Sequence, residues 1–130
     1  MKYEILDCTL RDGGYYTDWN FSSNLVKNYL KAIAKTPVKF VELGYLSNQN
    51  DHHGPYFHLN TKILKTAKQI LNKNQKISVM INAKEIKDSQ TLIKLIGKNQ
   101  KFIDTIRFAV DIEKLNIVEK ILKAKKNFKK

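Results

Sequence analysis

Near its start the chain carries a cation, a carboxylate and two glycines in succession, Arg11-Asp12-Gly13-Gly14. They follow an apolar segment, residues 3–10, whose alternation predicts a β-strand. A guanidinium can donate to a developing oxyanion, and a carboxylate can ligate a divalent cation. The sequence suggests no packing role for the glycines. We therefore expect them to form a turn at the mouth of the strand, where a ligand approaches the backbone closely.

Four apolar segments predict four strands, and a segment with helical periodicity follows each of them. The strands are expected at residues 3–10, 38–45, 76–82 and 103–110, and the helices around residues 25–33, 63–71, 85–96 and 115–122. Helices of this length suit the crossovers between parallel strands. The predicted fold class is therefore α/β, a parallel (βα)4 sheet in the order β-α-β-α-β-α-β-α, forming one domain over residues 1–130.

Each predicted strand has one apolar face and one face that becomes polar near its carboxyl end. The polar faces carry Asp7, Arg11, Glu42, Asn82 and Arg107. Because buried charges need partners, we expect these side chains to satisfy one another on a common concave surface. The interior of a barrel, or the carboxyl edge of an open sheet, would bring them together.

The formal net charge of +12 raises the question of nucleic-acid binding. Only two of the 24 basic residues are arginines, Arg11 and Arg107, and both lie in apolar strand contexts. Arginine is the residue suited to bidentate phosphate and base contacts. The lysines are scattered over helix faces and gather at the end of the chain, at Lys123, Lys125, Lys126, Lys129 and Lys130. We interpret them as a solvated surface, and we expect no nucleic-acid partner.

The single cysteine, Cys8, excludes an internal disulfide and fits a reducing compartment. Its position predicts packing on the helix-facing side of the first strand, where a thiol is inert. The sequence has no long apolar stretch. We therefore expect neither a signal peptide nor a membrane span, and a cytoplasmic location.

The run Leu-Asp-Cys-Thr-Leu-Arg-Asp-Gly-Gly at residues 6–14, with Val-Glu-Leu-Gly at residues 41–44, resembles the DRE-TIM metallolyase superfamily. This superfamily includes 4-hydroxy-2-oxovalerate aldolases, hydroxymethylglutaryl-CoA lyases and the isopropylmalate and homocitrate synthases, all built on a TIM barrel. The strongest resemblance is to bacterial aldolase catalytic-domain proteins that begin with Thr-Leu-Arg-Asp-Gly-Gly-Tyr. The Gly54-Pro55 loop and the strand at Thr105-Ile106-Arg107 also fit this group, whose domain is similar to that of pyruvate carboxyltransferases.

The resemblance implies a metal-dependent carbon–carbon lyase or aldolase that acts on a 2-oxo acid through an enolate. Asp12 would ligate the divalent metal, Mn²⁺ or Mg²⁺, with Zn²⁺ or Co²⁺ as alternatives. Arg11 would act catalytically by donating to the oxyanion. Glu42 would assist catalysis by orienting Arg11 or a metal-bound water. We expect the substrate to be bordered by Gly13, Gly14, Tyr15, Asn82 and Arg107.

The sequence departs from the family pattern in its candidate base and in its histidines. Tyr15 stands about where the hydroxy-oxovalerate aldolases have a histidine base, and a phenol with an ordinary pKa of about 10 is a poor base at neutral pH. The His-x-His pair of the family's metal site is missing from the chain. We expect His52, His53 and His58 to be exposed polar loop residues. Contact with substrate or metal is the alternative for them.

The length of the chain fits half of a TIM barrel, because a whole barrel takes about 250 residues. Three explanations are open: a truncated or split product, pairing with a second half-barrel or with another copy, and an open sheet that has lost activity. We favour truncation, with an incomplete site that is weakly active or inactive in this chain alone. The alternative functions are a non-catalytic interaction domain and a basic module that binds anions or nucleic acid.

Overall fold

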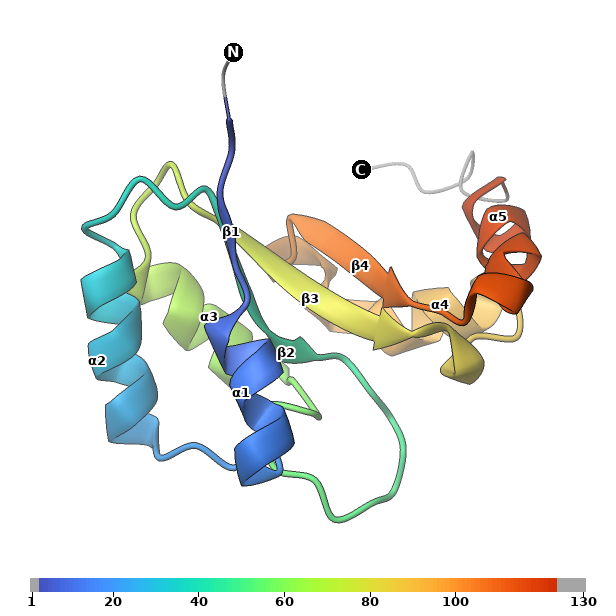
Figure 1. Cartoon of the computed structure of the whole chain (residues 1–130), viewed down its shortest axis with the longest axis horizontal. Helices are drawn as coiled ribbons and strands as arrows, with labels where there is room; N and C mark the ends of the chain where they lie inside the picture. The colour runs from blue at the N-terminus through green and yellow to red at the C-terminus, as the bar shows by residue number, and fades with distance from the viewer. Residues whose placement is uncertain (1–2, 124–130) are drawn as a thin grey trace.

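The structure is a computed structural model that describes residues 3–123. Strands and helices alternate along the chain (Figure 1). The elements are β1 (Leu6–Asp7), α1 (Thr9–Thr17), α2 (Ser23–Ile33), β2 (Phe40–Tyr45), α3 (Thr61–Ile70), β3 (Lys76–Asn82), η1 (Ala83–Glu85), α4 (Ser89–Ile96), η2 (Gly97–Phe102), β4 (Thr105–Ala109), η3 (Ile112–Lys114) and α5 (Leu115–Lys123). Of the terminal lysines, Lys125, Lys126, Lys129 and Lys130 lie outside the described residues.

The four strands form one parallel sheet in the order β1-β2-β3-β4. Each strand pairs with the next one along the chain, which is the arrangement in a TIM barrel. The register places Glu42 beside Ser78 and Met80 beside Arg107. The predicted α/β half-barrel fold is confirmed.

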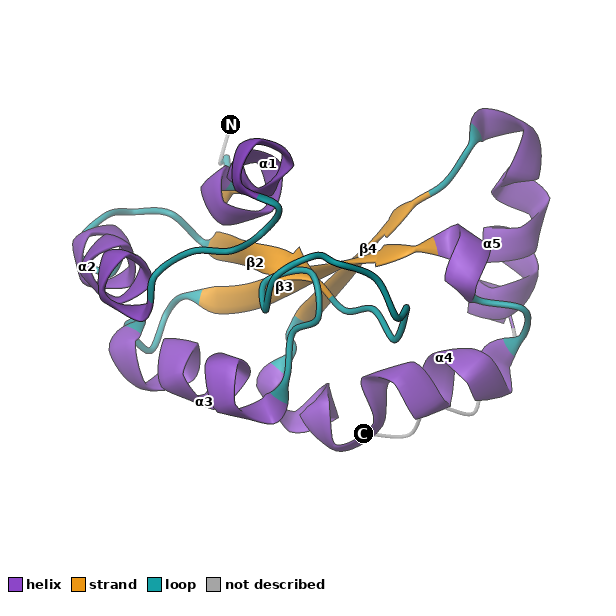
Figure 2. Cartoon of the chain, turned by 90° about the horizontal axis from the view of Figure 1, so that it is seen from below, coloured by secondary structure: helices purple, strands orange, loops and turns teal. Residues whose placement is uncertain are grey.

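Helices cover both faces of the sheet, but α1 lies apart from the others. In Figure 2, α3 and α4 lie below the strands and α1 lies above them. The α1 helix packs mainly against β2. It therefore occupies the face of the sheet that bears Glu42.

The centre of the sheet is fully buried. The side chains of Val41, Ile77, Val79 and Ile81 are 0% exposed and belong to the main hydrophobic core. They alternate with Glu42, Ser78 and Met80, which point to the opposite face, as the period of two in a strand requires. The predicted division between an apolar and a polar face therefore holds in β2 and β3. In β4, by contrast, all five residues are only half-buried.

The first strand is much shorter than predicted. The strand expected over residues 3–10 is only Leu6–Asp7, and α1 begins at Thr9. The carboxylate of Asp7 accepts a hydrogen bond from the Thr9 backbone N–H at 3.1 Å, which favours a turn into a helix. Leu10 and Gly14, four residues apart, form the buried side of that helix. The Arg11–Gly14 segment is therefore helical, and the expected glycine turn was wrong.

The remaining elements begin and end close to the predicted positions. Side-chain caps start three helices: Ser22 for α2, Asn60 for α3 and Asp88 for α4. Gly97 adopts a positive φ of 44° after α4, where glycine is favoured. No helix within residues 3–123 is long and apolar enough to cross a membrane.

Candidate active site around Glu42

Glu42 is the centre of a charge cluster built from three strands and α1. It lies in β2, and its side chain is 0% exposed. Its Oε1 accepts from Nε of Arg11 at 2.9 Å and from Nη1 of Arg107 at 3.1 Å. Its Oε2 accepts from the Ser78 hydroxyl at 3.2 Å. Sequence reasoning predicted that Arg11, Glu42 and Arg107 meet, and the structure brings them together.

Arg11 joins this buried cluster to an exposed carboxylate. Its Nη1 lies 2.5 Å from Oδ1 of Asp12, whose side chain is 55% exposed, whereas the Arg11 side chain is 15% exposed. Within residues 3–123, Nη2 of Arg11 donates no hydrogen bond to a protein group. One edge of the guanidinium thus remains available to an anionic ligand.

The surroundings of Arg11 and Cys8 favour the protonated form of both groups. Burial alone would lower the pKa of Arg11, but the hydrogen bond to Glu42 and the charge of Asp12 raise it. Cys8 donates from Sγ to Oδ2 of Asp12 at 3.0 Å. That hydrogen bond, together with burial, raises the pKa of the Cys8 thiol. The raised pKa keeps the thiol protonated and therefore less reactive. Its recorded partner is the Asp12 carboxylate, whereas the sequence predicted packing on the helix-facing side of the first strand.

Two of the five predicted cluster residues lie elsewhere. Asp7 accepts a hydrogen bond from the Tyr29 hydroxyl of α2, and it also contacts Thr9. These partners, and not Glu42 or the arginines, engage the Asp7 carboxylate. Asn82 caps η1, where its Oδ1 accepts from the Lys84 backbone N–H at 3.0 Å. The prediction that Asp7 and Asn82 bind within the charge cluster was wrong.

Tyr15 lies next to Tyr45 on the rim above the cluster. The two hydroxyl oxygens are 3.1 Å apart. Burial, followed by the hydrogen bond to Tyr15, raises the pKa of Tyr45. Both tyrosines and Asn82 line a hollow that also includes Trp19 and Phe57. Tyr15 therefore lies in the wall of this hollow, and its contact with a substrate stays a prediction.

The two glycines of α1 differ in what surrounds them. A Cβ atom on Gly14 would overlap the indole ring of Trp19. A Cβ on Gly13 would meet only Phe21, at 3.7 Å. The Trp19 indole N–H also donates to the Arg11 carbonyl oxygen at 2.9 Å. Gly14 thus has a packing role that the sequence did not reveal.

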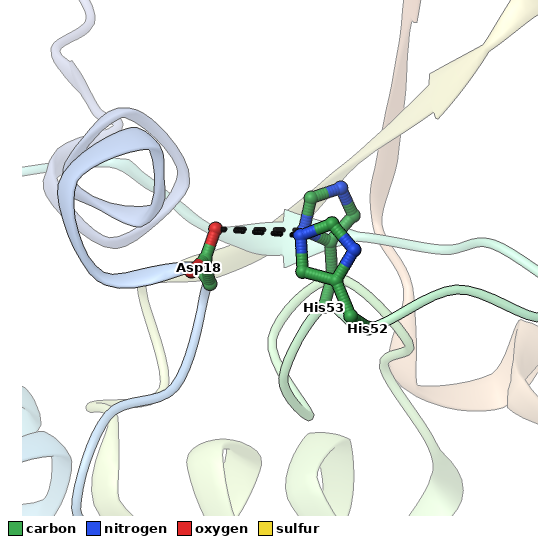
Figure 3. A group of neighbouring side chains, drawn as sticks. All are labelled: Asp18, His52 and His53. Carbon is green, nitrogen blue, oxygen red and sulfur yellow. Dashed lines mark ion pairs between the residues drawn. The ribbon is translucent and has the colours of Figure 1, made fainter.

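Two of the three histidines in the loop between β2 and α3 are less exposed than expected. Only His52 is largely exposed, at 75% of its side chain, while His53 and His58 are 23% and 26% exposed. His58 bonds through Nε2 to Asp51 at 2.8 Å. His52 and His53 lie beside Asp18, at the end of α1 (Figure 3). Sequence reasoning did not consider Asp18.

The donor set around Arg11 fits a metal site only in part. Asp12 is an exposed carboxylate in the first turn of α1, the helix that follows β1. Glu42 is already engaged by two guanidinium groups and a hydroxyl, so it has no oxygen to spare for a cation. Among the described residues near Arg11, Asp12 is thus the one carboxylate suited to Mg²⁺ or Mn²⁺.

One solved structure superposes closely on the chain. It is described as "Crystal structure of the N-terminal domain of a putative aldolase from Bacteroides vulgatus". The two chains are 34% identical with a TM-score of 0.87, over 95% of this chain and 41% of the other. This chain thus spans less than half the length of that protein, and it has the fold of an aldolase N-terminal domain.

Two further comparisons give no functional lead. A family model described as the RIH domain (RYDR_ITPR) matches residues 23–126. The structure does not support that relationship, because the same stretch lies almost wholly within the 95% of the chain that superposes on the aldolase domain. No curated protein matches the chain.

Proposed function

We propose that this chain, whose fold is that of an aldolase N-terminal domain, contributes one half of the active site of a divalent-metal-dependent carbon–carbon lyase. The substrate would be a 2-oxo acid that reacts through an enolate, as in the DRE-TIM metallolyases. One observation carries the proposal: buried Glu42 holds the Arg11 guanidinium next to the exposed carboxylate of Asp12.

In this proposal Arg11 and Asp12 act on the same end of the substrate. A metal bound to Asp12 would supply Lewis-acid stabilisation of the keto and carboxylate oxygens. Arg11 would donate from Nη2 to the oxyanion of the enolate, and its raised pKa keeps it charged. Glu42 would fix the orientation of Arg11, since it accepts the Nε–H at 2.9 Å. Arg107, held by the same carboxylate, would help to bind an anionic group of the substrate.

The proposed site needs groups from outside this chain. Asp12 offers one carboxylate, and a divalent ion of this class takes six or more ligands. Tyr45 does not suit the role of general base, because burial and its contact with Tyr15 raise its pKa. We therefore propose that a second half-barrel supplies the base and the other protein ligands. The length covered in the Bacteroides vulgatus protein, 41%, leaves room for such a half.

The exposure of the sheet edge at β4 supports the docking of a second half-barrel there. The five residues of β4 are half-buried, in contrast to the buried interior of β3. Beyond β4, the apolar side chains of Ile112, Leu115 and Leu122 are 82%, 52% and 45% exposed. We propose that the second half docks on this edge, because exposed parallel edges and apolar side chains favour association.

The basic binding module receives less support from the site. Both arginines are engaged by Glu42. Because both belong to the proposed substrate site, a nucleic-acid interface would depend mainly on lysines, which bind phosphate as point charges. A steep salt dependence of DNA or RNA binding would be its signature.

The proposal is tested by metal-dependent enolisation and by metal binding. Purified chain is incubated with Mn²⁺ and pyruvate in D₂O, and exchange of the methyl protons is followed by NMR. In parallel, Mn²⁺ binding in the presence of pyruvate is measured by electron paramagnetic resonance. We expect pyruvate to strengthen Mn²⁺ binding. We expect D12N to weaken that ternary binding tenfold or more and to remove any exchange above the buffer rate.

The matched control is D111N. Asp111 has the same exposed fraction as Asp12, 55%, but it pairs with Lys84 and lies outside the Glu42 cluster. We expect this variant to bind Mn²⁺ and pyruvate like the parent chain. R11K, which keeps the positive charge but loses the bidentate donor edge, should bind Mn²⁺ normally and lose the gain from pyruvate. If D12N and R11K both bind Mn²⁺ and pyruvate like the parent chain, the proposal is wrong.

A further inference from the structure

We propose that Asp18, His52 and His53 form a second metal site, one that takes a Zn²⁺-type transition-metal ion and does not involve Asp12. The three residues come from two segments, the end of α1 and the loop between β2 and α3. Their candidate ligand atoms all lie within 4.8 Å of one another (Figure 3). Neither the resemblance to metallolyases nor the aldolase neighbour assigns a role to these residues. The proposal is independent of the lyase function.

The distances in this cluster suit a shared cation better than direct contact. Oδ1 of Asp18 lies 3.8 Å from Nε2 of His52 and 3.8 Å from Nδ1 of His53. Both separations are too long for a hydrogen bond. Two ligands bound tetrahedrally to Zn²⁺ at about 2.0–2.1 Å lie about 3.4 Å apart. The Asp18 oxygen would thus move by a few tenths of an ångström relative to each nitrogen. The two histidine nitrogens lie within 4.8 Å of each other, and rotation of the exposed His52 side chain would bring them to the tetrahedral separation.

One atom of the cluster is buried without a partner. Nδ1 of His53 is inaccessible to solvent and has no hydrogen-bond partner in the described part of the chain. Leaving a buried ring nitrogen unsatisfied is costly, and such an atom calls for a ligand. A metal ion between Nδ1 and the Asp18 carboxylate would satisfy it.

The cluster is held in place by the backbone and by aromatic packing. Asp18 adopts a left-handed φ of 51°, and its carbonyl oxygen accepts from the Gly54 N–H at 2.6 Å. The ring of His53 packs against Trp19, at a centroid distance of 5.0 Å, and against Phe57, at 4.4 Å. These contacts fix the His53 ring and the aspartate before any ion arrives. Such preorganisation is what a metal site requires.

The ligand types select the class of metal. Two imidazoles and one carboxylate suit Zn²⁺, and also Co²⁺, Ni²⁺ and Cu²⁺. Mg²⁺ prefers oxygen ligands in an octahedral shell, so it should not compete. Three protein ligands leave the fourth tetrahedral position to water or to a substrate atom.

The test is a Zn²⁺ titration of the chain by isothermal calorimetry at pH 7.5. We expect one Zn²⁺ per chain. H52A should weaken binding at least tenfold, and because His52 is 75% exposed, its loss should leave the fold intact. D18N should have a similar effect, since asparagine tolerates the left-handed backbone. Zn²⁺ should raise the Tm of the parent chain and not that of H52A. Millimolar Mg²⁺ should leave the Zn²⁺ affinity unchanged.

Two control variants separate this site from its neighbours. His58 lies in the same loop, but its two ring nitrogens already contact Asp51 and the Ser47 carbonyl. H58A should therefore keep the parent affinity for Zn²⁺ within threefold. D12N should do the same, and this separates the result from the test of the lyase function. Absence of Zn²⁺ binding, or equal binding by the parent chain and H52A, would overturn the proposal. A loss confined to D12N would also overturn it.

Discussion

The Glu42 cluster and the Asp18–His52–His53 cluster lie on either side of Trp19, and they differ in how fully their charges are satisfied. Glu42 is 0% exposed and accepts hydrogen bonds from Arg11, Arg107 and Ser78. In the second cluster, no ligand atom of the trio approaches another closely enough for a hydrogen bond. The Glu42 carboxylate therefore has its partners within the protein and forms what we call the closed cluster. The Asp18, His52 and His53 side chains can still accept a ligand, and we call them the open cluster.

This difference separates residues that position from residues that bind. A buried carboxylate with three donors cannot also hold a cation, so Glu42 sets the orientation of the arginines. The groups that remain available are at the margin of the closed cluster, at Asp12 and at Nη2 of Arg11. A closed cluster beside open groups is what preorganised catalysis requires.

The largest effect is expected from E42Q. The amide cannot neutralise two guanidinium groups, so the Arg11 and Arg107 charges lose their shared buried partner. Removing one partner of a buried ion pair lowers the free energy of unfolding by about 3–5 kcal/mol. Urea denaturation followed by circular dichroism measures the change.

The control for that variant is S78A. It removes a neutral donor from the same carboxylate, whose Oε2 lies 3.2 Å from the hydroxyl, and should lower the free energy of unfolding by about 1 kcal/mol. If E42Q were no more destabilised than S78A, Glu42 would not be the charge centre described above.

A smaller effect is expected from G14A. The added methyl group would overlap the Trp19 indole, which lies between the two clusters, and overpacking of this kind costs about 1–3 kcal/mol. G13A is the matched control in the same helix. Its methyl group meets Phe21 at an ordinary distance, and alanine favours a helix, so its stability should be unchanged or higher. Equal loss in both variants would mean that the glycines do not differ in packing.

The smallest effect concerns the satisfied pair Asp51–His58, which lies in the same loop as the open cluster. Although partial desolvation acts in the opposite direction, the hydrogen bonds from His53 and His58 lower the pKa of Asp51. A carboxylate whose pKa is lowered by folding stabilises the protein above its unfolded pKa of about 3.9, and this contribution is lost as the pH falls through the folded value. The Tm is measured by thermal unfolding over about three pH units, from about pH 5 to about pH 2. It should fall less steeply with decreasing pH for D51N than for the parent chain. An identical slope in both would argue against the pair.

The sheet was predictable because its signal is local and repeated. The predicted strand at residues 76–82 has the same bounds as β3. The interior of β3 is buried, and burial constrains the residue types on both of its faces. The same alternation misled at residues 3–10. There, the Asp7–Thr9 turn and the Leu10–Gly14 spacing favour a helix, and tertiary packing against β2 decides between the two patterns.

The two clusters differ in predictability for the same reason. Arg11, Glu42 and Arg107 could be grouped from the faces of their strands, which a parallel sheet places side by side. Asp18 could not be grouped with the histidines. Its position depends on two consecutive left-handed residues, Asp18 and Trp19, neither of which is a glycine. The left-handed turn at Asp18 and Trp19 is held by long-range backbone contacts with the loop at Gly54, and a local sequence pattern does not reveal such contacts.

The position of Trp19 has one practical consequence. It is the only tryptophan in the sequence, its N–H contacts the Arg11 carbonyl oxygen, and its ring lies edge-on to His53. The chain therefore contains an intrinsic fluorophore between its two clusters. Its emission intensity should report a paramagnetic ion at the histidines, through quenching, and its emission wavelength should report any loosening of the helix that carries Arg11.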